Sequence, residues 1–188
     1  INYFSYDYPV PQSTETPFSI YTEMAPSPWN AGKHLLHIGL QGYDLDRNSL
    51  PAANLVFLID VSGSMQSANK LGLVKSSLKL LTKQLSGNDS IAIVTYAGSA
   101  GTVLEPVAGS EKRKIYEALD RLSARGSTWG EGGILAAYEL ARASFIENGI
   151  NRVVLATDGD FNVGIDSVQE LKKRIEQERK SGIGLTTL

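Results

Sequence analysis

From residue 54 onward, short apolar runs alternate with longer segments in which apolar residues recur at helical spacing. Residues 54–60 and 152–156 are almost continuously apolar, which is typical of strands buried on both faces of a sheet. The other predicted strands are residues 90–96, 103–107 and 183–188. Pro106 favours an edge position for its strand, because proline cannot donate a hydrogen bond inside a sheet.

Four segments between these runs carry apolar residues three or four positions apart, the spacing that places them on one side of a helix. Ser110 is the expected N-cap of the second helix, and Gly149 is expected to close the third. Ser167 and Glu170 have the spacing of a capping box at the start of the fourth. The stripes are Leu71, Val74, Leu78, Leu81 and Leu85; Ile115, Leu119 and Leu122; Ile134, Ala137, Tyr138, Ala141 and Phe145; and Val168, Leu171 and Ile175.

This alternation predicts an α/β fold: a doubly wound, mostly parallel sheet with right-handed crossovers and helices on both faces. Residues 1–53 differ, since they hold six of the seven prolines, a density that excludes long helices. Two extended stretches, residues 18–24 and 34–43, predict a short antiparallel β element there. We therefore expect a β-rich segment over residues 1–53, its aromatic side chains packed on a neighbouring domain over residues 54–188.

Composition narrows the function only slightly. The 188 residues carry 18 Lys and Arg against 20 Asp and Glu, so the net charge of −2 gives no electrostatic reason to expect nucleic acid. The lack of cysteine excludes disulfides, thiolate metal sites and a cysteine nucleophile. No apolar run is long enough for a transmembrane helix. Because the chain starts at Ile1 and stops in a predicted strand, we expect it to be a fragment.

In a parallel sheet, ligands bind beyond the carboxyl ends of the strands, so the residues that follow each strand are informative. Asp60, Ser62 and Ser64 follow the first buried strand, Asp158 follows the later one, and a glycine-rich loop between them holds Thr128. Carboxylate and hydroxyl oxygens are hard ligands that favour Mg²⁺, Ca²⁺ or Mn²⁺ over Zn²⁺. Ser64 has an alternative role as the cap of the following helix.

The run from Asn54 to Met65 resembles the first strand and metal loop of the von Willebrand factor type A domain. That family carries a metal-ion-dependent adhesion site, and its Asp-x-Ser-x-Ser, Thr and Asp positions match Asp60, Ser62, Ser64, Thr128 and Asp158. The resemblance implies that the two serines ligate a divalent cation directly and the other three directly or through water. It also implies a non-enzymatic adhesion module, in which an Asp or Glu of a protein partner completes the metal shell.

The N-terminal segment adds to this resemblance. Residues 2–9, 28–30 and 38–42 resemble a bacterial, cell-envelope branch of the family, which implies a periplasmic or surface location. Family domains continue with another helix and strand beyond the point where this chain stops. Trp129, which flanks Thr128, and Phe161 are candidate apolar contacts for the partner beside the ion. For Trp129, simple packing is the alternative.

An enzyme remains the alternative, with the same metal activating water or a phosphate. A haloacid-dehalogenase-like phosphatase needs a second Asp where Ser62 stands, and no Lys or His lies near the motif in sequence. The stretch from Asp158 fails as an EF-hand loop, with Val163 at its sixth position and Gln169 at its twelfth. The glycine-rich loop lacks the Gly-Lys-Ser/Thr ending of a P-loop, which argues against nucleotide binding. His34 and His37 lie far from the motif in sequence and are expected to be exposed or at the edge of the core.

Overall fold

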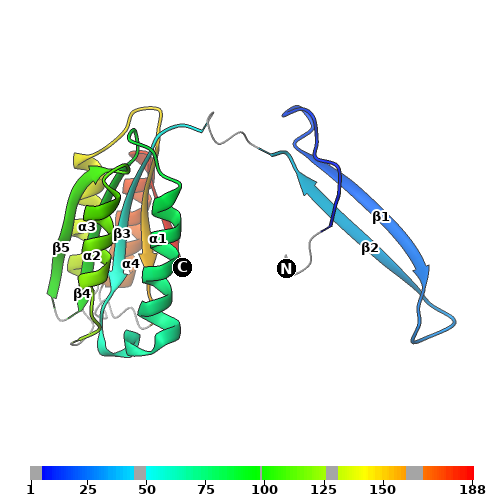
Figure 1. The fold of residues 1–188 in the computed structure, drawn as a ribbon, viewed down its shortest axis with the longest axis horizontal. Coiled ribbons are helices and arrows are strands. Elements are labelled where there is room, and N and C mark those ends of the chain that lie inside the picture. Colours follow the sequence, from blue (N-terminus) through cyan, green and yellow to red (C-terminus); the bar gives the residue numbers. More distant parts are fainter. Residues whose placement is uncertain (1–5, 45–49, 98, 126–130, 160–166) are drawn as a thin grey trace. The chain divides into compact units, whose positions relative to one another are not determined.

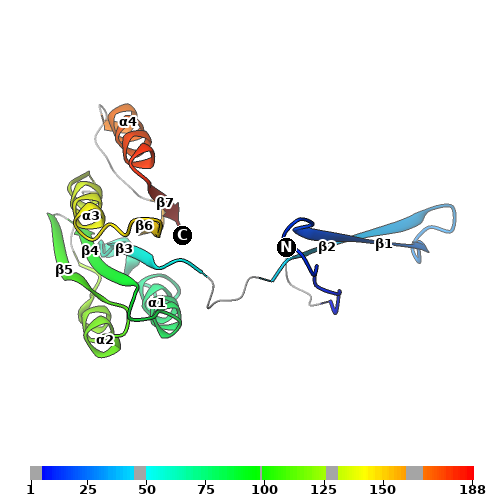
Figure 2. The same cartoon turned by 90° about the horizontal axis from the view of Figure 1, so that it is seen from above.

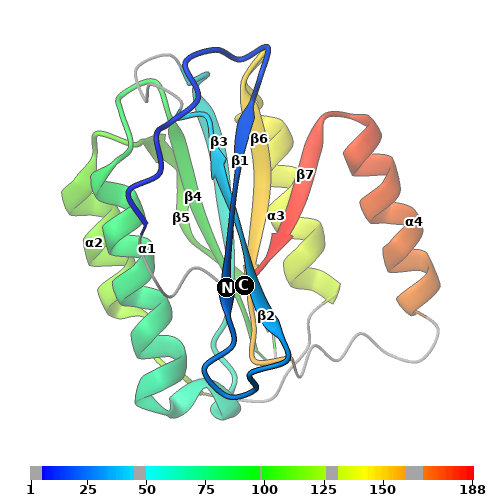
Figure 3. The same cartoon turned by 90° about the vertical axis from the view of Figure 1, so that its right-hand side faces the viewer.

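The computed structural model describes residues 6–44, 50–97, 99–125, 131–159 and 167–188. The chain divides into two compact units, Ile1–Leu50 and Pro51–Leu188. The second unit contains a five-stranded sheet in the order β5-β4-β3-β6-β7. Its strands are β3 (Ala53–Asp60), β4 (Ser90–Ala97), β5 (Ser99–Ala108), β6 (Ile150–Ala156) and β7 (Ile183–Thr187) (Figures 1 and 3).

The sheet is mostly parallel, as predicted. β3 pairs in parallel with both β4 and β6, and β7 pairs in parallel with β6. β5 is antiparallel to β4 and forms one edge of the sheet. Pro106 lies in this edge strand, where its missing N–H is tolerated. The fold is therefore the Rossmann-like α/β arrangement that the sequence pattern indicates.

Helices cover both faces of the sheet (Figure 2). α1 and α2 lie on one face, and α3 lies on the other with α4 beside it (Figure 2). Two short helical turns, η2 and η3, connect β3 to α1. The helical segments are η2 (Gly63–Gln66), η3 (Ala68–Gly72, a π-helical turn), α1 (Leu73–Lys83), α2 (Lys112–Arg121), α3 (Glu131–Ala143) and α4 (Ser167–Lys180).

The central strand β3 supplies both halves of the core. Val56 and Leu58 join the cluster on the α3 side, whereas Phe57 and Ile59 join the cluster on the side of α1 and α2. All four side chains are fully buried, so each stabilises the fold by about 1.5–3 kcal/mol relative to exposure. This confirms that the apolar run is a strand covered on both faces.

A buried polar residue begins the same strand. The Nδ2 amide of Asn54 donates to the carbonyl of Ala141, at 2.8 Å, and to Oδ1 of Asn151, at 3.2 Å. The Ser144 hydroxyl donates to Asn54 Oδ1 at 2.9 Å. These bonds tie the start of β3 to the end of α3 and to β6.

Three local predictions about helix ends are wrong. Glu111, not Ser110, is the N-cap residue of α2, and no side-chain hydrogen bond caps it. α3 ends at Ala143, so Phe145 lies beyond it, and the residue with positive φ there is Asn148, not Gly149. Position 149 requires glycine for a steric reason instead, since a Cβ there would lie 2.6 Å from the carbonyl oxygen of Ala52.

Two residues of the predicted stripes also fall outside α1. Leu71 is buried, but it belongs to η3, and Leu85 follows the end of the helix. In α4, Ile175 packs against the core as predicted. The side chains of Val168, Leu171, Ser167 and Glu170 lie outside the described residues.

The first unit is built on an antiparallel hairpin, as predicted, of β1 (Phe18–Pro26) and β2 (His34–Gly42). Tyr8 stacks on Tyr6 and Tyr21, with ring centroids 5.4 and 4.6 Å apart, and its hydroxyl lies 3.2 Å from Nε2 of His37. A Cβ at Gly39 would meet the Tyr8 ring at 2.5 Å, so glycine is required under that ring. The aromatic side chains thus order the segment itself; their packing on the other unit stays a prediction.

Asp89, in the turn before β4, fastens the start of β3. Its Oδ1 accepts the amide N–H of Ala53 at 2.8 Å, and its Oδ2 accepts the hydroxyl of Ser86 at 2.8 Å and the amide of the same residue. Partial burial acts to raise the pKa of Asp89, but these hydrogen bonds outweigh it and hold the pKa below its ordinary value.

We predict that Asp89→Asn lowers the free energy of unfolding at neutral pH by about 1–3 kcal/mol, because an amide cannot accept bonds at both of its ends. The stabilisation that comes from a lowered folded-state pKa is present above the ordinary carboxyl pKa of about 4 and is lost as pH falls through the folded value. In urea unfolding, the two proteins should therefore begin to converge as pH falls below about 4 and should converge fully only below the folded pKa. Asp120→Asn, at an exposed ion pair with Lys79, is the control and should change little. A difference independent of pH would contradict this assignment.

Candidate metal centre

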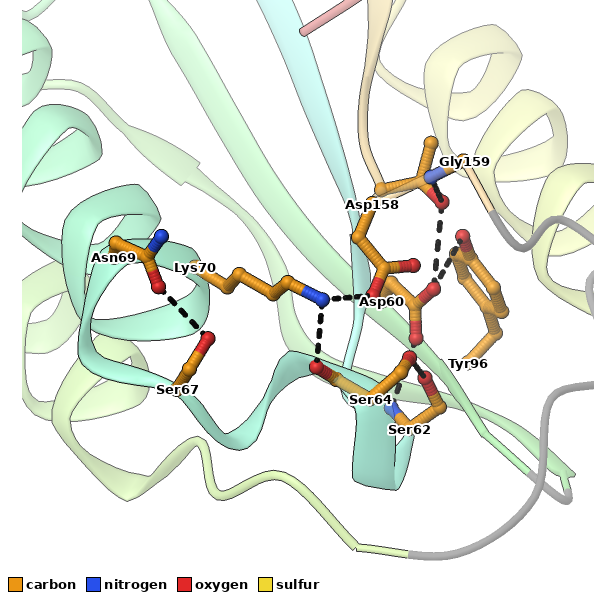
Figure 4. Close-up of polar contacts among 10 residues, drawn as sticks. Asp60, Ser62, Ser64, Ser67, Asn69, Lys70, Tyr96, Asp158 and Gly159 are labelled. Carbon is orange, nitrogen blue, oxygen red and sulfur yellow. Dashed lines mark hydrogen bonds and ion pairs between the residues drawn. The ribbon is translucent and has the colours of Figure 1, made fainter.

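The carboxyl ends of the parallel strands β4, β3 and β6 lie side by side at one end of the sheet (Figure 4). Asp60 ends β3, and the parallel register places it directly opposite Tyr96 of β4. Thr157 and Asp158 follow β6 on the other side of β3. The structure thus brings the predicted carboxylates Asp60 and Asp158 together with Ser62 and Ser64, as Figure 4 shows.

Asp60 is fully buried, and its carboxylate accepts hydrogen bonds from three neutral groups. Oδ1 accepts the amide N–H of Ser62 at 2.8 Å. Oδ2 accepts the hydroxyls of Tyr96, at 3.2 Å, and of Thr157, at 3.4 Å. Burial, with the negative charge of Asp60 adding to it, raises the pKa of Tyr96, so this phenol remains a hydrogen-bond donor.

Ser62 and Ser64 lie on the loop and helical turn that follow Asp60. Their hydroxyl oxygens are 2.9 Å apart, and the amide of Met65 donates to the carbonyl of Ser62 at 3.0 Å, which closes the turn. The helical segments that follow have Ser62, Ser67 and Gly72 at their N-caps, without a side-chain capping bond at any of them. The alternative role of Ser64 as a helix cap is therefore wrong.

Asp158 faces this turn from the loop after β6 (Figure 4). Its side chain is 11% exposed, and Oδ2 lies 2.8 Å from the ammonium of Lys70. The same ammonium donates to the backbone carbonyl of Ser64 at 3.0 Å. Behind Asp158, Gly159 takes a positive φ of 97°, and its amide donates to the Thr157 hydroxyl at 3.2 Å.

Sequence reasoning missed two residues of this centre. From the sequence, Tyr96 is predicted only as a core residue of a strand. Its contact with Asp60 follows from the register of β3 against β4. The expectation that no lysine lies near the motif is wrong, because η3 brings Lys70 to Asp158. Lys70 is the tenth residue after Asp60, and no local pattern marks that lysine.

Three predicted residues cannot be placed. Thr128, Trp129 and Phe161 lie outside the described residues, so their roles stay predictions. His37 contacts Tyr8 in the N-terminal unit. The structure therefore describes four of the five expected metal ligands.

The described donors fit a hard divalent cation. They are two carboxylates and two serine hydroxyls, all of them oxygen ligands. In the described part of the chain, no group of three or more His, Cys, Asp or Glu side chains could hold a metal ion. The lysine ammonium on Asp158 is an independent sign that this position attracts positive charge.

A cavity of ≈ 440 Å³ adjoins the centre. Lys70 and Asp158 are among its polar lining residues, and Met65, Leu73 and Val74 contribute to its apolar wall. Apolar surface therefore lies directly beside the carboxylate of Asp158.

None of the helices in the described residues is both long and apolar enough to cross a membrane.

Comparisons with known proteins agree with this architecture. The chain is 47% identical to the Escherichia coli protein YfbK over 193 residues, which cover all of this chain and 34% of that protein. The chain thus spans about a third of that relative. Inter-alpha-trypsin inhibitor heavy chain 4 of Mus musculus is 29% identical over 119 residues, 59% of this chain and 12% of the relative.

Two solved structures share the fold. One is proximal thread matrix protein 1 from the mussel byssus, described with a zinc-occupied MIDAS motif: 24% identity, TM-score 0.58, covering 73% of this chain and 35% of that one. The other is an aerotolerance-related membrane protein from Bacteroides fragilis: 23% identity, TM-score 0.56, covering 72% and 66%.

Two family models match the chain. The model described as von Willebrand factor covers residues 1–37, and the model for the von Willebrand factor type A domain covers residues 55–161, more than half of the chain. The protein belongs to the von Willebrand factor type A domain family.

Proposed function

We propose that this chain is a non-enzymatic module that binds a protein partner through a divalent cation. Asp60, Ser62, Ser64, Thr128 and Asp158 would hold the ion, which is Mg²⁺ in the first instance, with Ca²⁺ or Mn²⁺ as alternatives. The observation that carries the proposal is the pair of serine hydroxyls, 2.9 Å apart and free of capping bonds, beside two carboxylates at the carboxyl edge of the sheet.

The family supports this interpretation at a coarser level. Von Willebrand factor type A domains are commonly metal-dependent adhesion or interaction modules and are generally not enzymes. The mussel structure with zinc at its MIDAS motif shows that this fold accommodates a divalent cation there. The preference for Mg²⁺ in this chain rests on its all-oxygen donor set.

The charge of the centre indicates the kind of partner. Among the described donors only Asp60 and Asp158 carry negative charge, and the serine hydroxyls contribute oxygen ligands without charge. Two carboxylates do not fill the ligand shell of a divalent cation, so a bound ion would keep a position open for an Asp or Glu carboxylate of a partner. The apolar wall beside Asp158, together with Trp129 and Phe161, would contact apolar side chains around that carboxylate.

We also propose a location in the bacterial cell envelope, at the periplasmic side or the surface. The support is the N-terminal sequence of residues 2–9 and the likeness of the fold to the Bacteroides fragilis membrane protein. The partner would then be another protein of the envelope.

The first prediction is that Mg²⁺ or Mn²⁺ raises the melting temperature, because a ligand held only by the folded state stabilises it by mass action. At a concentration a hundredfold above Kd, the expected rise is about 5–10 °C. Asp60→Ala should abolish the rise, and Ser64→Ala should reduce it without removing a buried group.

Ser76→Ala is the matched control for the serine variant. The Ser76 hydroxyl donates to the carbonyl of Gly72 on the exposed side of α1, so its removal should leave the metal response unchanged. A full response in Asp60→Ala, measured by scanning calorimetry, would place the ion elsewhere in the protein.

The second prediction concerns the partner. Purified chain immobilised in Mg²⁺ should capture a protein from envelope extract, and EDTA should release it, because the cation bridges the two proteins. Thr128→Ala should weaken the capture while its circular dichroism and its melting temperature in EDTA stay those of the wild type, because only the metal-bound state loses a ligand. Thr102→Ala, on the exposed edge strand β5, is the control and should capture as the wild type does. Capture that survives both EDTA and Thr128→Ala would contradict the metal bridge.

A further inference from the structure

Lys70 connects the two loops of the candidate metal centre. It lies on the π-helical turn η3, ten residues beyond the last residue of β3, and its side chain is 37% exposed. Its ammonium donates to the Ser64 carbonyl, at 3.0 Å, and to Asp158 Oδ2, at 2.8 Å (Figure 4). One charged group therefore bridges the loop after β3 and the loop after β6.

The two carboxylates of the centre differ in what balances their charge. Asp60 is bonded to neutral donors, the amide of Ser62 and the hydroxyls of Tyr96 and Thr157. Asp158 is paired with a full positive charge in a position where its own side chain is 11% exposed. The Lys70 side chain is 37% exposed, so the pair is partly open to water and its strength lies between that of an open-surface pair and that of a buried one.

We propose that Lys70 is a built-in counter-ion of Asp158 that competes with the divalent cation and so lowers the cation affinity of the free protein. This inference rests on the proposed function, since it concerns the same centre. An ion near Asp158 would place a second positive charge beside the ammonium. The two like charges repel each other, so binding requires that Lys70 release the carboxylate or share it at reduced strength.

The surroundings of Lys70 allow that release. Its side chain lines the ≈ 440 Å³ cavity beside the centre, and more than a third of it is exposed. The ammonium can therefore move into solvent on its flexible stem without repacking the core. The free energy of the broken contact is subtracted from the free energy of cation binding.

The same contact stabilises the centre before any ion is present. Without the ammonium, Asp158 would lose the positive charge that lies 2.8 Å from its Oδ2, next to the second carboxylate of the centre, Asp60. The ammonium contacts both the loop after β3 and the loop after β6 and so holds them together. Lys70 thus lowers the affinity for the cation and, by the same contacts, stabilises the two loops when no cation is bound.

The test is titration calorimetry of the purified chain with Mn²⁺ and with Mg²⁺, after chelator treatment. Lys70→Met removes the charge and keeps an unbranched stem, and it should bind each ion about five- to tenfold more tightly than the wild type. Lys70→Arg keeps the charge and should remain within about twofold of the wild type. Lys79→Met is the matched control, since Lys79 forms a 2.6 Å pair with Asp120 on the neighbouring helix, and its Kd should not change.

The outcomes separate the inference from the function on which it rests. Equal Kd values for the wild type and Lys70→Met, or weaker binding by the variant, would overturn the inference while leaving the metal centre in place. Binding that is unchanged in Asp60→Ala, or absent from wild type and Lys70→Met alike, would overturn the proposed function itself. Tighter binding by Lys70→Met that is lost again in the double variant with Asp60→Ala would support both.

Discussion

The burial of the Asp60 carboxylate is the constraint on which the centre depends. β3 passes through the middle of the sheet with apolar side chains on both faces, and its last residue is a fully buried acid. A buried charge is tolerated only where hydrogen-bond donors replace water. The donors come from three segments: the amide of Ser62 and the hydroxyls of Tyr96 and Thr157. Satisfying one carboxylate therefore fixes the loop after β3 against the ends of β4 and β6.

The remaining features of the centre follow from this arrangement. Because Asp60 accepts the Ser62 amide, the chain turns sharply into η2 and places two hydroxyls 2.9 Å apart, facing the loop after β6. The same turn leads into η3, which places Lys70 against Asp158. The hydrogen bonds of the Asn54 side chain connect the opposite end of β3 to α3 and to β6. A rigid strand anchored at both ends thus supports loops whose side chains remain available.

Much of the architecture could be predicted from local patterns, because continuous apolar runs and helical stripes report burial directly. The convergence of Asp158 with Asp60, Ser62 and Ser64 could also be predicted, since a parallel sheet brings the carboxyl ends of its strands together. The contact of Tyr96 with Asp60 could not, because strand register depends on pairing between distant segments. The position of Lys70 could not be predicted because it lies on a π-helical turn. At this point the sequence shows only the start of an apolar helical stripe at Leu71, which does not indicate such a turn. The prediction of Ser110 as the N-cap of α2 was wrong because several polar residues in succession can each occupy the N-cap position.

The balance of charge explains why such a centre would depend on its partner. A divalent cation is held tightly when several carboxylates contact it, whereas hydroxyls contribute oxygen ligands without negative charge. Here two carboxylates serve the centre, and one of them already pairs with an ammonium at 2.8 Å. The cation would consequently be held weakly by this chain alone and would gain from any further carboxylate. A partner's Asp or Glu supplies the missing ligand and the missing charge in one group, so the affinity for the ion and the affinity for the partner rise together, as thermodynamic linkage requires.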